Sequence, residues 1–95
     1  MTSIGDAAFG DCRLLTNISI PNSITSIGNS AFNGCTSLAD ITIPNSVKHI
    51  GTSAFSNCKQ LESINIPNTV VELGIHAFTQ CKNCSIIFFG NNYQF

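Results

Sequence analysis

One segment recurs four times, at a constant spacing, along this chain of 95 residues. Its copies contain "SIGDAAFGDCRLL", "SIGNSAFNGCTSL", "HIGTSAFSNCKQL" and "ELGIHAFTQCKNC". When the copies are aligned, a glycine, an alanine, a phenylalanine and a cysteine never change, and the period can be read from Gly5, Gly28, Gly51 and Gly74. A fixed period of this length is the sequence signature of a solenoid, in which each repeat forms one turn. The chain is therefore predicted to fold as a stack of about four turns.

Two of the invariant positions are predicted to form the centre of the core. One repeat cannot bury its own apolar side chains, whereas stacked repeats bury each side chain against its copies in the neighbouring turns. The predicted core columns are Phe9, Phe32, Phe55 and Phe78, and Cys12, Cys35, Cys58 and Cys81. The predicted units are 4–26, 27–49, 50–72 and 73–95, which together form a single domain over residues 1–95.

Each repeat divides into three predicted pieces. The segments "LTNISIP", "LADITIP" and "LESINIP" alternate apolar and polar residues, which is typical of a half-buried strand, and their prolines end it. A second short β-prone segment follows, as in "ITSIG", and closes with the invariant glycine, which suits a tight bend. The spacing in "AFNGC" then predicts one turn of α-helix or 3₁₀-helix. The sequence thus predicts a mostly β solenoid with short helical turns.

The consensus L-x-x-I-x-I-P-x-S-[VI]-x-x-I-G-x-x-A-F-x-x-C resembles the BspA-type leucine-rich repeat. This repeat occurs in bacterial surface proteins and in surface proteins of parasitic protists such as trichomonads. The resemblance implies a right-handed leucine-rich-repeat solenoid with one strand of each turn in a parallel sheet on one face. It also implies a cell-surface or secreted adhesin or interaction protein. Its ligand would be a protein or a glycan, such as a host matrix or cell-surface protein.

The two ends of the chain depart from the repeat pattern. Alignment of the last copy on the others puts Ile86 and Phe88 at outward positions that are polar in other repeats, and Ile87 and Phe89 at inward ones. The first repeat begins halfway through a unit, and neither end carries a polar capping segment. Solenoids need polar ends for solubility. We therefore expect the chain to be part of a longer array and to self-associate through its uncapped ends.

The outward positions of the predicted "LTNISIP"-type strands form the candidate ligand-binding face, because leucine-rich repeats usually bind through their sheet face. These residues are Asn17, Ser19, Asp40, Thr42, Ser63, Asn65 and Phe88. Small hydroxyl and amide groups suit polar contacts with protein or sugar. The alternative is that they only keep the strands soluble. Asn17-Ile18-Ser19 and Asn83-Cys84-Ser85 are also glycosylation sequons, and a sugar on Asn17 would argue against this face.

The 5 cysteines invite a metal or disulfide interpretation, which the repeat geometry disfavours. Cysteines that recur once per turn stack in a column about 4.8 Å apart, with their Cβ atoms farther apart than the ~3.8 Å that a disulfide prefers. A straight column does not converge on a tetrahedral zinc ion. The C-x-x-C of Cys81 and Cys84 lacks partner ligands. The cysteines are therefore predicted to be buried thiols that act as small apolar filler, with no metal or cofactor.

No catalytic arrangement is evident. His49 and His76 occupy different repeat positions, and neither has a carboxylate or thiol at ligand spacing along the chain, so both are interpreted as solvated surface residues. Nucleophilic catalysis needs a base beside a nucleophile and a third group that orients the base. The acidic residues are scattered, and neither a nucleophile elbow nor a phosphate-binding glycine motif occurs. The chain is therefore predicted not to be an enzyme.

The charge and hydropathy of the chain argue against two classes of partner. Charged residues make up only 9% of the chain, and the net charge of −1 comes without a basic cluster along the sequence. Binding to nucleic acid or insertion into a membrane is therefore not expected. No signal segment or membrane span is present, which leaves a cytoplasmic location open. The main prediction is a non-catalytic adhesin-like module. The alternative is an intracellular repeat scaffold or a truncated gene copy without independent function.

Overall fold

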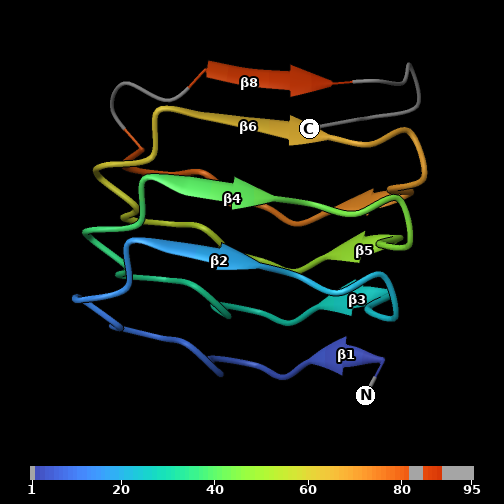
Figure 1. The fold of residues 1–95 in the computed structure, drawn as a ribbon, viewed down its shortest axis with the longest axis horizontal. Coiled ribbons are helices and arrows are strands. Elements are labelled where there is room, and N and C mark those ends of the chain that lie inside the picture. The colour runs from blue at the N-terminus through green and yellow to red at the C-terminus, as the bar shows by residue number, and fades with distance from the viewer. Residues whose placement is uncertain (1, 82–84, 89–95) are drawn as a thin grey trace.

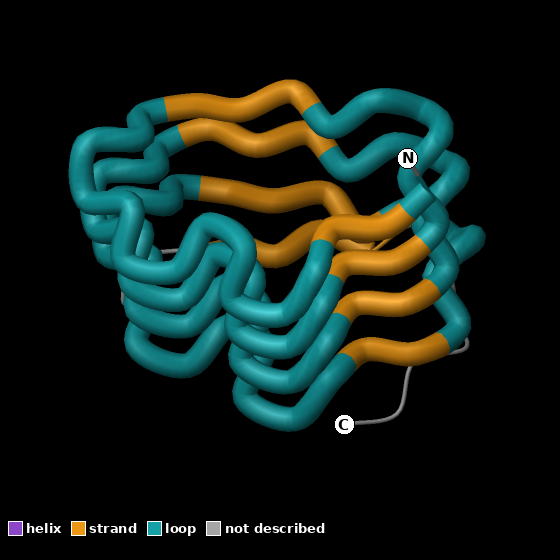
Figure 2. The backbone as a smooth tube through the Cα atoms, turned by 90° about the horizontal axis from the view of Figure 1, so that it is seen from below, coloured by secondary structure: helices purple, strands orange, loops and turns teal. Residues whose placement is uncertain are grey.

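The computed structural model describes residues 2–81 and the backbone of residues 85–88. The chain winds as a solenoid whose successive turns lie one above the other, with two strands in each full turn (Figure 1). Seen from below in Figure 2, the strands of the two kinds lie on two sides of the coil, and long irregular segments connect them. The predicted leucine-rich-repeat solenoid is therefore confirmed.

One side of the solenoid is a four-stranded parallel sheet in the order β1-β3-β5-β7. Its strands are β1 (Ser3–Ile4), β3 (Ser26–Ile27), β5 (His49–Ile50) and β7 (Glu72–Leu73). The pairing keeps equivalent repeat positions together, so that Ile27 pairs with Ile50 and Ile50 with Leu73. These are the strands predicted from the "ITSIG"-type segments. Their isoleucines face the core because a strand presents alternate residues to opposite faces.

The "LTNISIP"-type segments form the strands of the other side. They are β2 (Asn17–Ser19), β4 (Asp40–Thr42), β6 (Ser63–Ile66) and β8 (Ser85–Phe88). β2 pairs with β4 and β6 pairs with β8, both in parallel, and β4 lies beside β6. Along β6 the side chains alternate between exposed and buried, as the period-two pattern predicted.

The predicted helical turn is the part of the repeat in which the structure differs from the prediction. The described residues contain no helix, and the segment after each glycine is a run of consecutive turns. The N–H groups of this run alternate between two kinds of acceptor. The N–H of Phe9 donates to the carbonyl of Ala31 in the next turn at 2.8 Å, whereas that of Gly10 donates to Ala7 in its own turn at 2.9 Å. This alternation requires left-handed residues, such as Ser30 with a φ of 57°.

The hydrogen bonds between turns run in both directions along the solenoid. In the β1-β3-β5-β7 sheet, the N–H of Gly28 donates to Ile4 of the preceding turn at 2.8 Å. In the run of turns, the N–H of Phe32 donates to Ala54 of the following turn at 2.8 Å. Each interface between repeats is therefore joined by backbone hydrogen bonds donated from both sides, which satisfies polar groups that the core would otherwise bury.

The phenylalanines form a continuous stack through the middle of the core. The ring centroids of Phe9 and Phe32 lie 5.2 Å apart, those of Phe32 and Phe55 5.3 Å, and those of Phe55 and Phe78 5.6 Å. The rings are parallel to within 4°. Phe32 and Phe55 have no exposed surface, while Phe9 and Phe78 pack against the core from its two ends. The predicted aromatic column is confirmed.

The invariant glycine is required by close stacking. A Cβ atom built on Gly28 would lie 2.7 Å from the backbone nitrogen of Asp6, and one built on Gly51 would lie 2.6 Å from that of Asn29. Neither glycine has a positive φ. Glycine is therefore not required here for a left-handed backbone conformation. Glycine is needed because the backbones of neighbouring turns approach each other at this position.

The last strand is shifted by one residue relative to the expected period. β8 pairs Ile64 with Ile86 and Ile66 with Phe88, whereas the regular repeat spacing would have paired Ile66 with Phe89. A shift of one residue exchanges the two faces of a strand. The backbone of Phe88 thus pairs with that of Ile66, a buried core residue, and the predicted outward placement of the Phe88 side chain lies outside what the structure describes.

Candidate functional site

The predicted binding face is a regular array of polar side chains. In β2 and β4, Asn17 pairs with Asp40 and Ser19 pairs with Thr42. All the predicted face residues on β2, β4 and β6 are exposed: Asn17, Ser19, Asp40, Thr42, Ser63 and Asn65. Each stands next to an apolar residue that faces the core, as in β4, where Ile41 is buried. The fold therefore gathers these six candidates on one face, and the side chain of Phe88, the seventh candidate, lies outside the described part of the structure.

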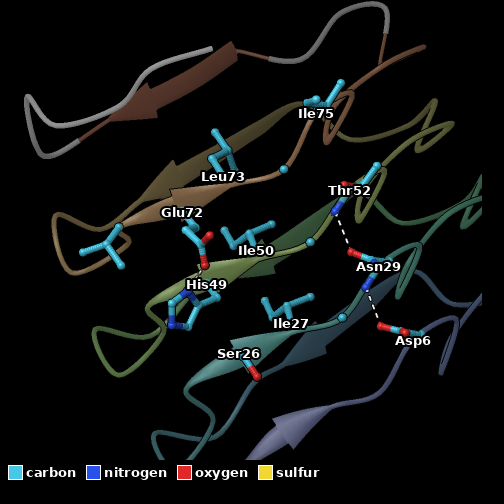
Figure 3. Close-up of a pocket in the computed structure, with 14 residues that line it drawn as sticks. Asp6, Ser26, Ile27, Asn29, His49, Ile50, Thr52, Glu72, Leu73 and Ile75 are labelled. Atoms are coloured by element: carbon cyan, nitrogen blue, oxygen red, sulfur yellow. Dashed lines mark hydrogen bonds and ion pairs between the residues drawn. The ribbon is translucent and has the colours of Figure 1, made fainter.

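A second surface feature was missed by the sequence analysis. An open groove of about 610 Å³ runs along the β1-β3-β5-β7 sheet and crosses its turns (Figure 3). Its lining comes from the same repeat positions in successive turns, including the glycine column. The apolar residues Val71 and Ile75 line it in the fourth turn, and they are 62% and 71% exposed. The signal available for this groove was the recurrence of the lining positions, since Gly28, Gly51 and Gly74 are one repeat apart and all line it.

His49 does have a carboxylate partner, contrary to the sequence interpretation. Its Nδ1 atom lies 2.6 Å from Oε1 of Glu72 across the groove lining (Figure 3). The two residues are paired across β5 and β7, so adjacent turns bring together residues that are distant in the sequence. Both side chains are about half or more exposed, at 49% and 75%. An exposed pair of this kind contributes little to stability. Ser26, which carries a hydroxyl, pairs with His49 across β3 and β5 in the same groove lining.

Side-chain oxygens reinforce the stacking beside the groove. Oδ1 of Asp6 accepts a hydrogen bond from the N–H of Asn29 at 2.8 Å, and Oδ1 of Asn29 accepts one from the N–H of Thr52 at 2.9 Å (Figure 3). Asp6 and Asn29, which follow Gly5 and Gly28, thus each accept a hydrogen bond from the backbone of the next turn. Ile75 occupies the same repeat position in the fourth turn and has no side-chain oxygen. Asp6 and Asn29 therefore help to hold neighbouring turns together.

The cysteines also form a column, and their thiols are hydrogen-bonded. Cys35 and Cys58 are buried, whereas Cys12 and Cys81 are partly exposed, and all four are free thiols. Sγ of Cys35 donates to the carbonyl of Phe9 at 3.0 Å, and Sγ of Cys58 to that of Phe32 at 3.2 Å. Each buried thiol thus fills space and also satisfies a backbone carbonyl of the preceding turn. The predicted role as apolar filler therefore accounts for only the first of these two functions.

The thiols differ in pKa because their environments differ. Burial raises the pKa of Cys35. Within the Cys58–Cys81 pair, the hydrogen bond between the two side chains and then burial raise the pKa of Cys58. The same interaction lowers the pKa of Cys81 to about 7, because the Cys58 proton stabilises a thiolate on its more exposed neighbour when it turns from the Phe32 carbonyl towards Cys81. Among these three cysteines, Cys81 is therefore the most readily ionised.

This difference predicts selective alkylation of the native protein. Cys81 should react with iodoacetamide at a rate that rises with pH through about 7, because the thiolate is the nucleophile. Cys35 and Cys58 should stay unmodified until the chain is unfolded, because they are buried and ionise at higher pH. Mass spectrometry of tryptic peptides at several pH values measures this. Alkylation of Cys58 as fast as that of Cys81 would contradict the buried column.

In the described part of the chain, no group of three or more histidine, cysteine, aspartate or glutamate side chains is placed to hold a metal ion. Within residues 2–81 and 85–88, no helix could cross a membrane. The polar strand face and the groove are both open to a ligand.

Comparison with known families identifies the family of the chain. The profile of the BspA type leucine rich repeat region (6 copies) matches residues 2–95. The chain belongs to this family. The leucine-rich-repeat consensus read from the sequence is thereby confirmed over nearly the whole chain.

Solved leucine-rich-repeat structures superpose on the chain. A T. pallidum leucine-rich-repeat protein is 28% identical with a TM-score of 0.75, over 90% of this chain and 51% of that one. A Bacteroides capillosus leucine-rich-repeat protein is 31% identical with a TM-score of 0.78, over 94% and 64%. A leucine-rich cell surface protein from Faecalibacterium prausnitzii is 27% identical with a TM-score of 0.61, over 92% and 31%.

This BspA-type chain covers less than two thirds of each of those structures. No curated protein sequence matches it significantly. The family and its solved members support a repeat module that mediates protein interactions, and such repeats are typically non-catalytic scaffolds. The exposed side chains must determine which ligand is bound, because proteins with the same fold can bind many different ligands.

Proposed function

We propose that the chain is an adhesin-like interaction module that binds protein or glycan ligands through the exposed strand face of β2, β4 and β6. The observation that carries this proposal is the in-register array of small polar side chains on that face. Ser19 and Thr42 pair directly, and Asn65 continues their column on β6. Hydroxyl and amide groups both donate and accept hydrogen bonds, so the array can match the mixed polar groups of a glycan or a peptide backbone.

A surface location is part of this proposal. The family resemblance includes surface proteins, and one solved relative is described as a leucine-rich cell surface protein. Surface labelling of intact cells that produce the native protein tests the location. Labelling of the protein in intact cells supports the adhesin-like role. Labelling only after lysis would instead favour the intracellular scaffold.

Binding through the strand face predicts a loss of affinity when its central column is changed. The triple variant Ser19→Lys, Thr42→Lys and Asn65→Lys should bind about tenfold or more weakly, because an interface would have to desolvate unpaired ammonium groups. The probes are a glycan array and a panel of purified extracellular matrix proteins. Affinities for any probe that the unmodified chain binds are then measured by surface plasmon resonance.

The matched control places the same three charges elsewhere on the solenoid. Asn22, Asn45 and Asn68 occupy one repeat position at the corner after each strand, and all three are exposed. Their replacement by lysine should leave binding unchanged. Equal losses in the two triple variants, or no binding of any probe by the unmodified chain, would contradict the proposal. Thermal melts confirm that both variants fold, since exposed substitutions usually change stability by less than about 0.5 kcal/mol.

A further inference from the structure

The few basic residues of the chain are concentrated at one repeat position. The chain has only 4 lysine and arginine residues in total. Arg13, Lys59 and Lys82 stand at equivalent positions of the repeat, where the second repeat has Thr36, and Lys82 lies outside the described residues. These basic residues are not clustered along the sequence, because one whole repeat separates each position from the next. In the solenoid, stacking of the turns places equivalent repeat positions one above another.

The structure places this column beside a shallow depression. Arg13, Thr36 and Lys59 line a space of about 210 Å³ at the corner that leads into β2, β4 and β6. Arg13 and Lys59 are both exposed, and they stand two turns apart. Since neighbouring turns are spaced by about 4.8 Å, the two side chains arise from points about 10 Å apart along the solenoid. Each of these cations can therefore pair with its own anionic group along the axis of the solenoid.

Neutral polar groups occupy the space between the two cations. The hydroxyl of Thr36 lies between them in the column, and the amides of Asn33 and Asn57 line the same depression. Nδ2 of Asn57 donates to Oδ1 of Asn33 at 3.2 Å, which fixes both amides in place. No aromatic side chain is part of the described lining, so nucleobases have no surface to stack on. The depression thus combines two separated positive charges with hydroxyl and amide groups.

We propose that this column is a binding site for a linear anionic glycan. Sulfate or carboxylate groups on neighbouring sugars would pair with Arg13 and Lys59, and sugar hydroxyls would contact Thr36 and the two amides. A linear polymer suits the site because the cations are repeated along a straight axis. The site is separate from the polar strand face and does not depend on ligand binding there.

The opposing charge at this site is Asp11. Its carboxylate lines the same depression and would repel an anionic ligand. Asp11 has a φ of 56°, a conformation that asparagine adopts about as readily as aspartate. Asp11→Asn therefore removes the charge without disturbing the backbone. This variant makes it possible to test the sign of the electrostatic contribution.

Binding of a size-defined heparin oligosaccharide at low ionic strength tests the proposal. The double variant Arg13→Gln and Lys59→Gln should bind about tenfold more weakly, because it loses two ion pairs. Asp11→Asn should bind about threefold more tightly. The matched control is Lys48→Gln, which removes an exposed lysine from a different repeat position and should leave the affinity unchanged.

Three outcomes would overturn the proposal. The unmodified chain would fail to bind the heparin oligosaccharide, or Lys48→Gln would weaken binding as much as the double variant, or single-stranded DNA of equal charge would bind as tightly as heparin. Thermal melts of each variant exclude unfolding as the cause of a loss. Failure here leaves the strand-face variants unaffected, since the two experiments share no residue.

Discussion

Replacing Phe55 by alanine is expected to lower the free energy of unfolding by about 3–5 kcal/mol. The ring has no exposed surface and stacks between Phe32 at 5.3 Å and Phe78 at 5.6 Å. Its loss therefore removes buried apolar area, leaves a cavity and interrupts the stack between Phe32 and Phe78. Chemical denaturation followed by circular dichroism gives the free energies of the variant and the unmodified chain.

Leu14→Ala is the control for this experiment. Leu14 is 93% exposed, so its truncation should change the free energy of unfolding by less than about 0.5 kcal/mol. Phe55→Leu should fall between the two, because leucine keeps part of the buried volume but not the stacked ring. Equal losses for Phe55→Ala and Leu14→Ala would show that the phenylalanine column does not form the core.

Replacing Gly51 by alanine is expected to cost about 3 kcal/mol or more, although the change adds only one methyl group. The new Cβ would lie 2.6 Å from the backbone nitrogen of Asn29 and 2.6 Å from the carbonyl carbon of Gly28. Both atoms belong to the backbone of the preceding turn and cannot rotate away. The two turns would have to separate, which weakens the hydrogen bonds between them.

Gly5 provides a control at the same repeat position. A Cβ atom on Gly5 would have no atom within 4 Å. Gly5→Ala should therefore be neutral or slightly stabilising, because alanine restricts the unfolded chain. The same denaturation measurement applies to both variants. A similar loss in both would mean that the glycine column is needed for its backbone conformation and not for close stacking.

The sequence was sufficient to predict the repeat, its core and one polar face. These features depend on which positions recur, and Phe32 and Phe55 recur with the same neighbours in every turn. The pairing of Asn17 with Asp40 and of Ser19 with Thr42 follows from the same register. Because stacking places equivalent positions side by side, the alignment of the repeats is already a map of lateral contacts.

The conformation inside each turn could not be predicted in the same way. The segment after the glycine contains two left-handed positions per repeat. Asp11, Gly34 and Asn57 occupy one of them, and these residue types tolerate a positive φ, so a signal was present. Ala7 and Ser30 occupy the other, where the residue type gives no signal and the hydrogen bonds to the next turn decide the conformation.

The one-residue shift in β8 also escaped prediction. The segment "SIIFF" is apolar after its serine, so its composition fits either register. In β6, by contrast, serine and asparagine alternate with isoleucine and fix the face of every residue. The pairing of His49 with Glu72 was missed for a different reason. The alignment puts the two residues at the same repeat position, but only the stacked structure shows that their side-chain atoms lie 2.6 Å apart.

The backbone hydrogen bonds between turns, which are donated in both directions, determine which insertions and deletions in the gene the fold can tolerate. Every turn presents the same donors and acceptors to the turn before it and the turn after it, so recombination between copies can insert or delete a whole repeat and leave compatible surfaces behind. A deletion of a single residue shifts the inward residues of the following strand to the outside. Selection on related genes should therefore tolerate variation in repeat number far more readily than variation in repeat length.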